Sequence, residues 1–367
     1  MDFAFSEEQQ MLRDGARGFL ASKVPSDTVA ELAESDAGWD RALWPQIAEL
    51  GWLGLSVAED AGGAGMGFIE DAVLFEEMGY ALFPGPFFST VALALPVLAG
   101  RSDAASDVIE GRATATFAWA EAGGPTDLKD IRDLATKAEG SDGEWTLTGE
   151  KDLVTDLGAA DLIVVAAQGS GGVGLWLVRA DGDGITKTEL LGLDGTRRMG
   201  RLSLNGAPAE LLVEPGEAAE VIGSVRLRAL TALAVEATGI SQRVLDLAKA
   251  YVSERQQFGK PIGTYQAVSH QVANMYMDTE LARSTGYWAA WAVAENDESA
   301  IGAASAAKAA AGPSAVLACE RAIQVHGGIG FTYEHILHRY YKRAQWIEAF
   351  EGSSAMHRAE LAKTLLD

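Results

Sequence analysis

The apolar positions of the first third of the chain recur three or four residues apart, which is the spacing of a helix with one buried face. The pattern runs from Phe5 to about Gly100, where it gives way to other spacings. Ser6 is followed three residues later by Gln9, a pair typical of a capping box at the first turn of a helix. We therefore expect an N-terminal helical domain over residues 1–112.

Short runs of β-branched and aromatic residues, separated by glycine and aspartate, replace the helical pattern from about Arg112. The runs ATATFAW, DLIVVAAQG and RMGRLSLNG follow one another with no helical stretch between them. Such runs predict strands, and the lack of intervening helices favours antiparallel pairing. The pattern indicates an antiparallel sandwich or barrel, and we expect an antiparallel β-barrel domain over residues 113–222.

The helical period returns at about Ser224 and continues to the end of the chain. A first long segment is followed by a second after the sequence GKPIG, and then by an alanine-rich third segment. We expect Gly312 and Pro313 to interrupt this third helix, because proline removes a backbone donor. The pattern predicts a C-terminal four-helix bundle over residues 223–367 and a fold of class α+β, mainly α.

Composition limits the classes of function. The 367 residues include 29 basic and 52 acidic side chains, and the net charge of −23 argues against nucleic acid and anionic membranes as partners. The acidic start does not resemble a signal peptide, and no apolar run approaches a membrane span, so we expect a cytoplasmic protein. The five histidines are scattered and Cys319 is the single cysteine, so no metal site is predicted.

The stretch 321–358 holds the candidate for proton chemistry. Glu351 follows two aromatic residues, Trp346 and Phe350, and directly precedes Gly352. A carboxylate beside aromatic side chains is poorly hydrated, which suits a general base. The alternative is a solvated glutamate near the start of a helix, where the helix dipole favours an acid.

Two motifs of the last third resemble the acyl-CoA dehydrogenase family. SERQQFGKPIGTYQAV is similar to the family's Arg-x-x-Phe-Gly-Lys segment, and QVHGGIGFTYEHILHRYYKRA is similar to its Gln-x-x-Gly-Gly-x-Gly-Phe segment. ELGWLGLSVAEDAGGAGM and KDLVTD resemble family segments less specifically. The resemblance covers essentially the whole chain.

The resemblance implies FAD, held between the subunits of a tetramer, and an acyl-CoA substrate. Arginine can pair with a pyrophosphate, and glycine allows a cofactor to approach the backbone closely. The implied cofactor contacts are Arg255, Phe258, Gln266, Gln324, Gly328, Thr155 and Ser353. The implied substrate contacts are Thr126, Arg228 and Gly352.

The resemblance also implies a mechanism. Glu351 would remove the pro-R α-proton of the acyl thioester while hydride leaves the β-carbon for flavin N5, which gives a trans-2-enoyl-CoA. An electron-transfer flavoprotein would then accept the electrons. Some relatives place the base on the first long helix of the bundle, where this chain has Ala229.

Three positions depart from the family pattern. Ala120 replaces a threonine that bonds the flavin, Leu153 replaces a tryptophan over the ring, and Leu230 replaces an arginine near CoA. These losses leave alternatives open: one subunit of a mixed tetramer acting on bulky or steroid acyl-CoA, a catalytically silent partner subunit, or a flavin monooxygenase or oxidase. Residue types do not identify the acyl chain.

Overall fold

Two compact units make up the chain, each assembled from separate stretches of sequence. The computed structural model describes residues 5–124, 126–141 and 143–366, without the side chains of 364 and 365. The first unit contains the described residues up to Glu31, Phe68–Phe83, and those from Leu230 onward. The second unit contains Leu32–Gly67 and Pro84–Ala229.

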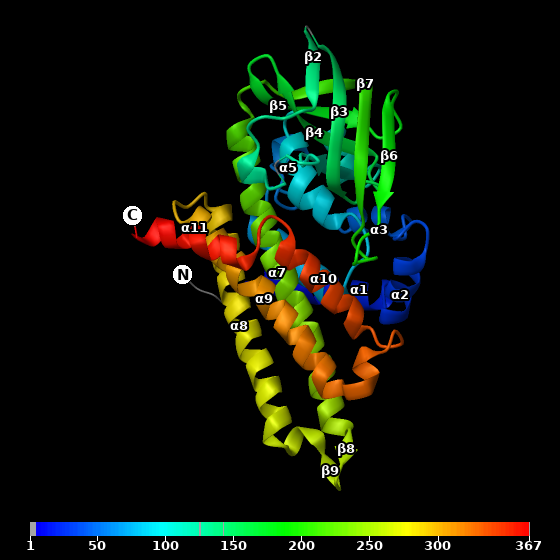
Figure 1. Cartoon of the computed structure of the whole chain (residues 1–367), viewed down its shortest axis with the longest axis vertical. Helices are drawn as coiled ribbons and strands as arrows, with labels where there is room; N and C mark the ends of the chain where they lie inside the picture. Colours follow the sequence, from blue (N-terminus) through cyan, green and yellow to red (C-terminus); the bar gives the residue numbers. More distant parts are fainter. Residues whose placement is uncertain (1–4, 125, 142, 367) are drawn as a thin grey trace. The chain divides into compact units, whose positions relative to one another are not determined.

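The first unit is helical (Figure 1). Its elements are α1 (Glu7–Lys23), the first part of α2 (Ser26–Glu34), α4 (Phe68–Ala81), most of α7 (Ala218–Glu254), the hairpin β8 (Gln256–Gln257) and β9 (Lys260–Pro261), η4 (Ile262–Thr264), α8 (Gln266–Ala294), α9 (Ala300–His326), η5 (Gly327–Phe331), α10 (Leu337–Ala349) and α11 (Ser354–Leu366). The predicted capping box is confirmed at α1, where the Gln9 N–H donates to Ser6 Oγ at 3.1 Å and the Ser6 N–H to Gln9 Oε1 at 3.0 Å.

Helix α9 contacts three other helices of this unit, α8, α10 and α11. It runs unbroken through Pro313, so the expected interruption at Gly312 and Pro313 is wrong. A proline inside a helix costs about 3 kcal/mol, but the alanines of α9 are buried against three neighbouring helices. Gly312 permits a close approach to α10, since a Cβ there would lie 2.1 Å from Glu348 Oε2. Packing therefore outweighs the lost backbone hydrogen bond.

Helices α4 and α7 cross at two glycines. A Cβ on Gly79 would lie 2.1 Å from the carbonyl oxygen of Glu236, and a Cβ on Gly239 would lie 1.9 Å from that of Glu76. Real side-chain carbons do not approach a backbone oxygen this closely. The two glycines therefore set the depth at which α7 packs in the first unit.

The second unit combines short helices with a β domain. Its helical elements are the end of α2, α3 (Leu43–Glu49), η1 (Glu59–Ala61), the π-helical η2 (Phe88–Ala94), α5 (Leu95–Leu98), α6 (Ala104–Ile109), η3 (Leu128–Asp130) and the start of α7. Its strands are β1 (Ala115–Ala118), β2 (Lys137–Ser141), β3 (Glu144–Thr155), β4 (Leu162–Gly169), β5 (Gly172–Arg179), β6 (Ile185–Leu190) and β7 (Met199–Val213).

The strands close into a barrel. The order β4-β2-β3-β7-β5 returns to β4 through the β4–β5 pairing, while β1 pairs with β4 and β6 with β7 outside this ring. Pairing is antiparallel except for β1–β4 and β2–β4, which are parallel. Leu147, Trp176 and Leu202 are fully buried in the apolar interior. The predicted succession of helical, β and helical domains is confirmed, with a mixed rather than wholly antiparallel sheet.

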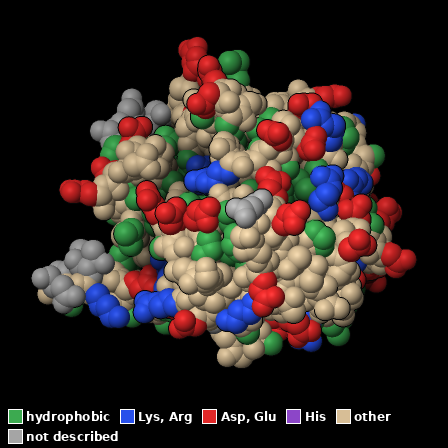
Figure 2. Space-filling view, turned by 90° about the horizontal axis from the view of Figure 1, so that it is seen from above, with side chains coloured by type: hydrophobic (Ala, Val, Ile, Leu, Met, Phe, Trp, Pro, Cys, Tyr) green, Lys and Arg blue, Asp and Glu red, His purple; other side chains and the backbone are tan. Residues whose placement is uncertain are grey.

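Charge on the surface follows the composition. Acidic side chains are spread over the face seen in Figure 2, with basic side chains between them. Among the residues that the structure describes, no helix combines the length and the hydropathy that crossing a bilayer requires.

Candidate functional site

Glu351 lies in the turn between α10 and α11. Helix α10 ends at Ala349, Phe350 is extended, and Glu351 adopts a left-handed backbone conformation with φ of +56°. Gly352 continues the turn with φ of +95°. The turn buries Glu351, which is only 3% exposed, so it is not a solvated glutamate.

The aromatic side chains before Glu351 pack on each other. The rings of Trp346 and Phe350 are stacked, with centroids 4.4 Å apart and planes 22° apart. A carboxylate that has lost part of its hydration is a candidate to accept a proton. The arrangement can therefore supply a general base.

The two residues after Glu351 have different environments. Gly352 is buried and its carbonyl oxygen accepts a hydrogen bond from Lys308 Nζ at 3.0 Å. Ser353 is exposed, and its carbonyl oxygen accepts the backbone N–H of His357 at 3.1 Å. Of these two expected contacts, Ser353 is therefore the one accessible from outside the chain.

Five of the expected cofactor contacts lie at one end of the helical bundle. The rings of Tyr251 and His326 stack with centroids 4.3 Å apart, which joins the end of α7 to the end of α9. Helix α8 starts at this end, after the hairpin of β8 and β9 (Figure 1). The five residues located on these chain segments are Arg255, Phe258, Gln266, Gln324 and Gly328.

All five of these residues are exposed. Phe258 is 93% exposed and has a positive φ of +52°, an unusual position for a large apolar side chain. Across the described ranges of the chain, Arg255 has no carboxylate in ion-pair contact, so its guanidinium is available to a phosphate. A Cβ on Gly328 would meet nothing within 4 Å, which leaves room against the backbone. This end of the bundle can hold a large polar ligand from outside the chain.

Two histidines behind this surface are disposed to be neutral. Burial lowers the pKa of His326, whose Nδ1–H donates to the carbonyl oxygen of Ala322 at 2.7 Å. Burial also lowers the pKa of His335, and the neighbouring His326 adds to the effect. Both lowered pKa values favour the uncharged imidazole at these two positions.

Thr155 lies at the end of β3 in the second unit. It is fully buried, and its carbonyl oxygen accepts the Thr116 hydroxyl at 2.6 Å. Its own hydroxyl is buried without a hydrogen-bond partner among the described residues. An unsatisfied buried hydroxyl costs about 1–3 kcal/mol, and a polar ligand group would remove that cost. Thr155 therefore fits the flavin contact that the resemblance implies.

A buried ion pair fixes the strand that leads to Thr155. Lys151 Nζ donates to Glu121 Oε1 at 2.6 Å and to the carbonyl oxygen of Trp119 at 3.3 Å. Burial lowers the pKa of Lys151 to about 8, although Glu121 acts to raise it. Burial acts to raise the pKa of Glu121, but hydrogen bonds from Lys151 and Thr136 hold it below its usual range. The pair ties β3 to the segment that contains Ala120.

The two remaining expected substrate contacts also lie in the second unit. Thr126 is exposed, and its carbonyl oxygen accepts the indole N–H of Trp119 at 2.9 Å. Arg228 donates to Ser56 Oγ and lines a cavity of about 210 Å³. The other lining residues include the apolar Leu53, Val91 and Leu95, so this cavity joins a cation to an apolar wall.

The positions that depart from the family pattern differ in how much of each residue is exposed. Ala120 is 4% exposed, and its carbonyl oxygen accepts the Asp152 N–H at 2.8 Å. Leu153 is 40% exposed, with a φ of +54° at an irregularity in the β3–β7 pairing. Ala229 and Leu230 are fully buried in α7. No acid occupies the alternative base position, and Leu153 presents an aliphatic side chain where a ring was expected.

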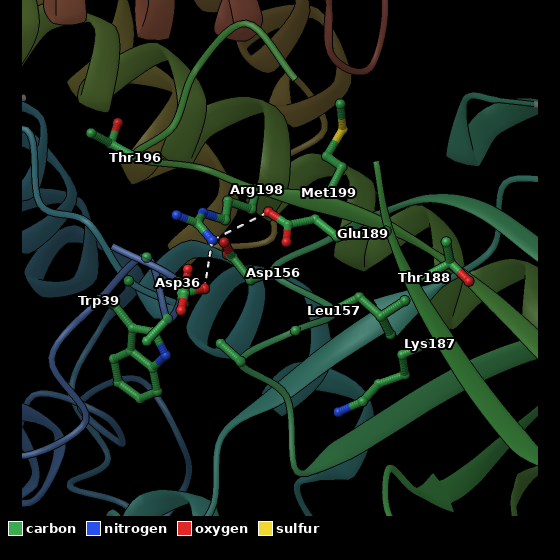
Figure 3. A pocket seen from close by; sticks show the side chains of 16 residues that line it. Asp36, Trp39, Asp156, Leu157, Lys187, Thr188, Glu189, Thr196, Arg198 and Met199 are labelled. Atoms are coloured by element: carbon green, nitrogen blue, oxygen red, sulfur yellow. Dashed lines mark hydrogen bonds and ion pairs between the residues drawn. The ribbon is translucent and has the colours of Figure 1, made fainter. Parts of the chain in front are cut away.

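A further cavity in the second unit has a volume of about 230 Å³. None of the expected site residues lines it, although Asp156, which does, directly follows Thr155 in the sequence. Arg198 dominates it and is already engaged, as Figure 3 shows. It donates to the carbonyl oxygen of Asp36 at 2.7 Å and pairs with Glu189 at 3.2 Å. This cavity offers no unsatisfied cation to a ligand.

Sequence reasoning overlooked two residues beside Glu351. Lys308 is fully buried in α9, and His357 is fully buried in α11. A single lysine within the run AASAAKAAAG was a signal, because a charge in an apolar helix must have partners. His357 left no comparable signal, because its Nε2 contacts a backbone carbonyl, which every residue has.

Three family models match successive parts of the chain. They describe the N-terminal, middle and C-terminal domains of acyl-CoA dehydrogenase, over residues 6–104, 116–207 and 228–366.

Individual relatives agree with these matches. Acyl-CoA dehydrogenase IpdE2 of Mycobacterium tuberculosis is 31% identical over 92% of this chain and 91% of its own. A solved structure of a Tcur3481–Tcur3483 steroid ACAD variant is 30% identical with a TM-score of 0.85, over 98% of each chain. The ChsE4–ChsE5 complex from M. tuberculosis is 26% identical with a TM-score of 0.89, over 100% of this chain and 99% of that one.

Proposed function

Because the chain belongs to the acyl-CoA dehydrogenase family of FAD-dependent oxidoreductases, we propose that Glu351 is the base that removes the α-proton of an acyl-CoA. The observation that carries the proposal is its placement: an acid 3% exposed, in a left-handed turn between two helices. The alternative position on α7 holds Ala229, which cannot accept a proton.

The proposed reaction forms a carbon–carbon double bond. The Glu351 carboxylate takes the α-proton, and the electron pair of that C–H bond becomes the second bond between the α and β carbons. When bound, FAD supplies the acceptor for the hydride that leaves the β-carbon. The product is a trans-2-enoyl-CoA. The thioester α-proton is weakly acidic, and we assign the backbone N–H of Glu351 as one donor to the carbonyl oxygen as negative charge develops there.

The residues present fit FAD in two places. Thr155 has a buried hydroxyl that lacks a partner within the described part of the chain, which suits a polar edge of the flavin. Arg255 offers an exposed guanidinium, which suits the pyrophosphate. Phe258, Gln266, Gln324, Gly328 and Ser353 complete the proposed cofactor set. Thr126, Arg228 and Gly352 are proposed for the substrate, and an electron-transfer flavoprotein for the electrons.

Anaerobic bleaching of the flavin absorbance tests the base. Glu351→Gln keeps the size of the side chain but removes its basicity, so we expect bleaching by an acyl-CoA to slow by about three orders of magnitude or more. Glu298→Gln makes the same change at an exposed residue between α8 and α9 and serves as the matched control. A Glu351→Gln protein that bleaches as fast as its parent would remove Glu351 as the base.

The same assay identifies the substrate class. We propose a panel of short, long, branched and steroid-derived acyl-CoA, because one methylene in an apolar pocket changes binding by only about 1–3 kcal/mol. The similarity to a steroid ACAD makes the bulky members the first to test. Rapid reoxidation of the bleached protein by oxygen, with product formation, would instead indicate the oxidase or monooxygenase alternative.

A second candidate is that this chain works as one subunit of a mixed tetramer. Ala120, Leu153 and Leu230 remove side chains that the family pattern expects around flavin and CoA. One of the similar structures is a complex of two differently named chains. Light scattering of the chain purified alone tests this: a homotetramer with one FAD per subunit contradicts it, and an FAD-poor protein that gains FAD with a related subunit supports it.

A further inference from the structure

A buried lysine holds the backbone on both sides of Glu351. We call residues 350–353, between α10 and α11, the base loop. Lys308 of α9 is fully buried, and its Nζ donates to the carbonyl oxygen of Glu348 at 3.2 Å and to that of Gly352 at 3.0 Å. These carbonyls lie three residues before and one residue after Glu351. One side-chain amine therefore spans the entry and the exit of the base loop.

A histidine holds the carbonyl between them. His357 of α11 is fully buried, and its Nε2 lies 2.9 Å from the carbonyl oxygen of Glu351. A carbonyl can only accept, so Nε2 is the protonated nitrogen of this contact. The loop is also closed from α10, since Glu348 Oε1 accepts the backbone N–H of Ser354 at 2.9 Å.

The base loop needs such contacts. Its left-handed conformation at Glu351 costs about 1–2 kcal/mol for a residue with a side chain, and Gly352 follows with another positive φ. The last carbonyls of α10 have no partner within the helix, and they carry the negative end of its dipole. The Lys308 side-chain amine satisfies one of these carbonyls.

We propose that Lys308 is a positioning residue for the base, with His357 as its second support. The inference rests on the proposed role of Glu351. Lys308 does not exchange a proton with the substrate; it fixes the peptide units around Glu351, and with them the direction of its carboxylate. Because Lys308 belongs to α9, which contacts α8, α10 and α11, the aim of the base is set by the packing of the bundle rather than by the loop itself.

Lys308→Met tests the proposal with little change in side-chain volume. A displacement of about 1 Å at a reacting group can cost 100-fold in rate, so we expect the rate of flavin bleaching at saturating acyl-CoA to fall by about 10- to 100-fold. Acyl-CoA affinity, measured by titration, should change less than about threefold. We expect the isotope effect for α-deuterated acyl-CoA to rise above the parent value, because proton removal becomes slower relative to the other steps.

Hydrogen exchange supplies a readout independent of catalysis. Amides of a peptide covering residues 349–354 should exchange faster in Lys308→Met than in the parent, with FAD present or removed. The matched pair His357→Leu and His357→Gln tests the second support: the leucine removes the donor, whereas the glutamine can present an amide N–H to the same carbonyl. We expect the glutamine variant to be closer to the parent in both rate and exchange.

The proposal is overturned if Lys308→Met folds, binds FAD and behaves like the parent in all three measurements. Its bleaching rate would then be within twofold of the parent rate, and its α-isotope effect and its hydrogen exchange would be unchanged. If that variant does not fold, equal behaviour of His357→Leu and the parent overturns it instead. The base assignment is read separately by Glu351→Gln. If Glu351→Gln bleaches as fast as the parent, Glu351 is not the base. If Glu351→Gln bleaches slowly but Lys308→Met bleaches at the parent rate, only the positioning role of Lys308 is refuted.

Discussion

The buried ion pair between α7 and α10 gives a stability prediction of defined size. Arg343 Nη1 lies 2.6 Å from Glu236 Oε1, and both side chains are only 1% exposed. Arg343→Met removes the guanidinium and leaves the carboxylate of Glu236 buried beside a thioether. Breaking one side of a buried pair costs about 3–5 kcal/mol, because the remaining charge cannot regain its hydration. We expect a loss of stability of that order.

The assay is the thermal midpoint of unfolding of the FAD-loaded protein, followed by flavin fluorescence. At roughly 2 °C per kcal/mol for a protein larger than about 150 residues, the expected fall is about 6–10 °C. Arg321→Met is the matched control, since Arg321 and Asp278 form a pair that is 25% and 35% exposed. Partly hydrated pairs contribute about 1 kcal/mol or less, so the control should fall by no more than about 2 °C.

The double variant Arg343→Met/Glu236→Leu distinguishes the cost of a buried charge that has lost its partner from the cost of lost packing. The double variant also removes the carboxylate that Arg343→Met deprives of its guanidinium, so most of the stability lost in Arg343→Met should return. If the double variant is as unstable as Arg343→Met alone, the cost lies in packing around Arg343 rather than in the stranded charge. A fall of less than about 2 °C for Arg343→Met would refute the reasoning altogether.

Three further changes have defined outcomes. Thr155→Val removes the buried hydroxyl that lacks a partner among the described residues, so FAD affinity measured by fluorescence should fall about tenfold, while Thr186→Val on the exposed β6 leaves it unchanged. Burial lowers the pKa of Lys151 from 10.5 to about 8, so between these pH values the unfolded chain binds more protons than the folded one, and the contribution of this lysine to stability rises with pH. The thermal midpoint of the parent, relative to that of Lys151→Met/Glu121→Gln, should therefore increase from about pH 8 to 10. A difference that stays constant over this range would contradict the prediction. Gly239→Ala places a Cβ 1.9 Å from the Glu76 carbonyl oxygen and should cost about 2–3 kcal/mol in thermal unfolding, whereas Gly302→Ala, where a Cβ meets nothing within 4 Å, should gain about 0.5–1 kcal/mol.

Local patterns in the sequence predicted local structure well. The Ser6–Gln9 capping box is present, and the period of apolar residues located the long helices of the bundle. The same reasoning failed at Pro313, because the local cost of a proline was smaller than the packing of α9 against three helices. Closure of the barrel through β4 and β5, and the parallel pairing of β1, depend on contacts between distant segments that a strand pattern does not encode. The domain boundaries at residues 112 and 222 stay predictions.

The sequence could predict site residues only where their function depends on the type of side chain. Glu351 could be singled out because an acid stands beside aromatic residues and a glycine, and its burial agrees with the proposed role. The support of that acid could not be found in the same way. Lys308 and His357 both donate to backbone carbonyls, which every residue possesses, so no residue type at positions 348, 351 or 352 identifies the partner.

These contacts divide the proposed chemistry between parts of the chain that can be altered separately. The position of Glu351 depends on α9, α10 and α11 in the first unit, through Lys308 and His357. The position of Thr155 depends on β3 in the second unit, through Lys151 and the hydrogen bond from Thr116. We therefore expect substitutions around the base loop to slow proton removal while FAD stays bound, and substitutions around Thr155 to weaken FAD while the base loop keeps its protection from hydrogen exchange. A Thr155→Val protein whose base loop exchanged as fast as that of Lys308→Met would show that the two sets of contacts are coupled.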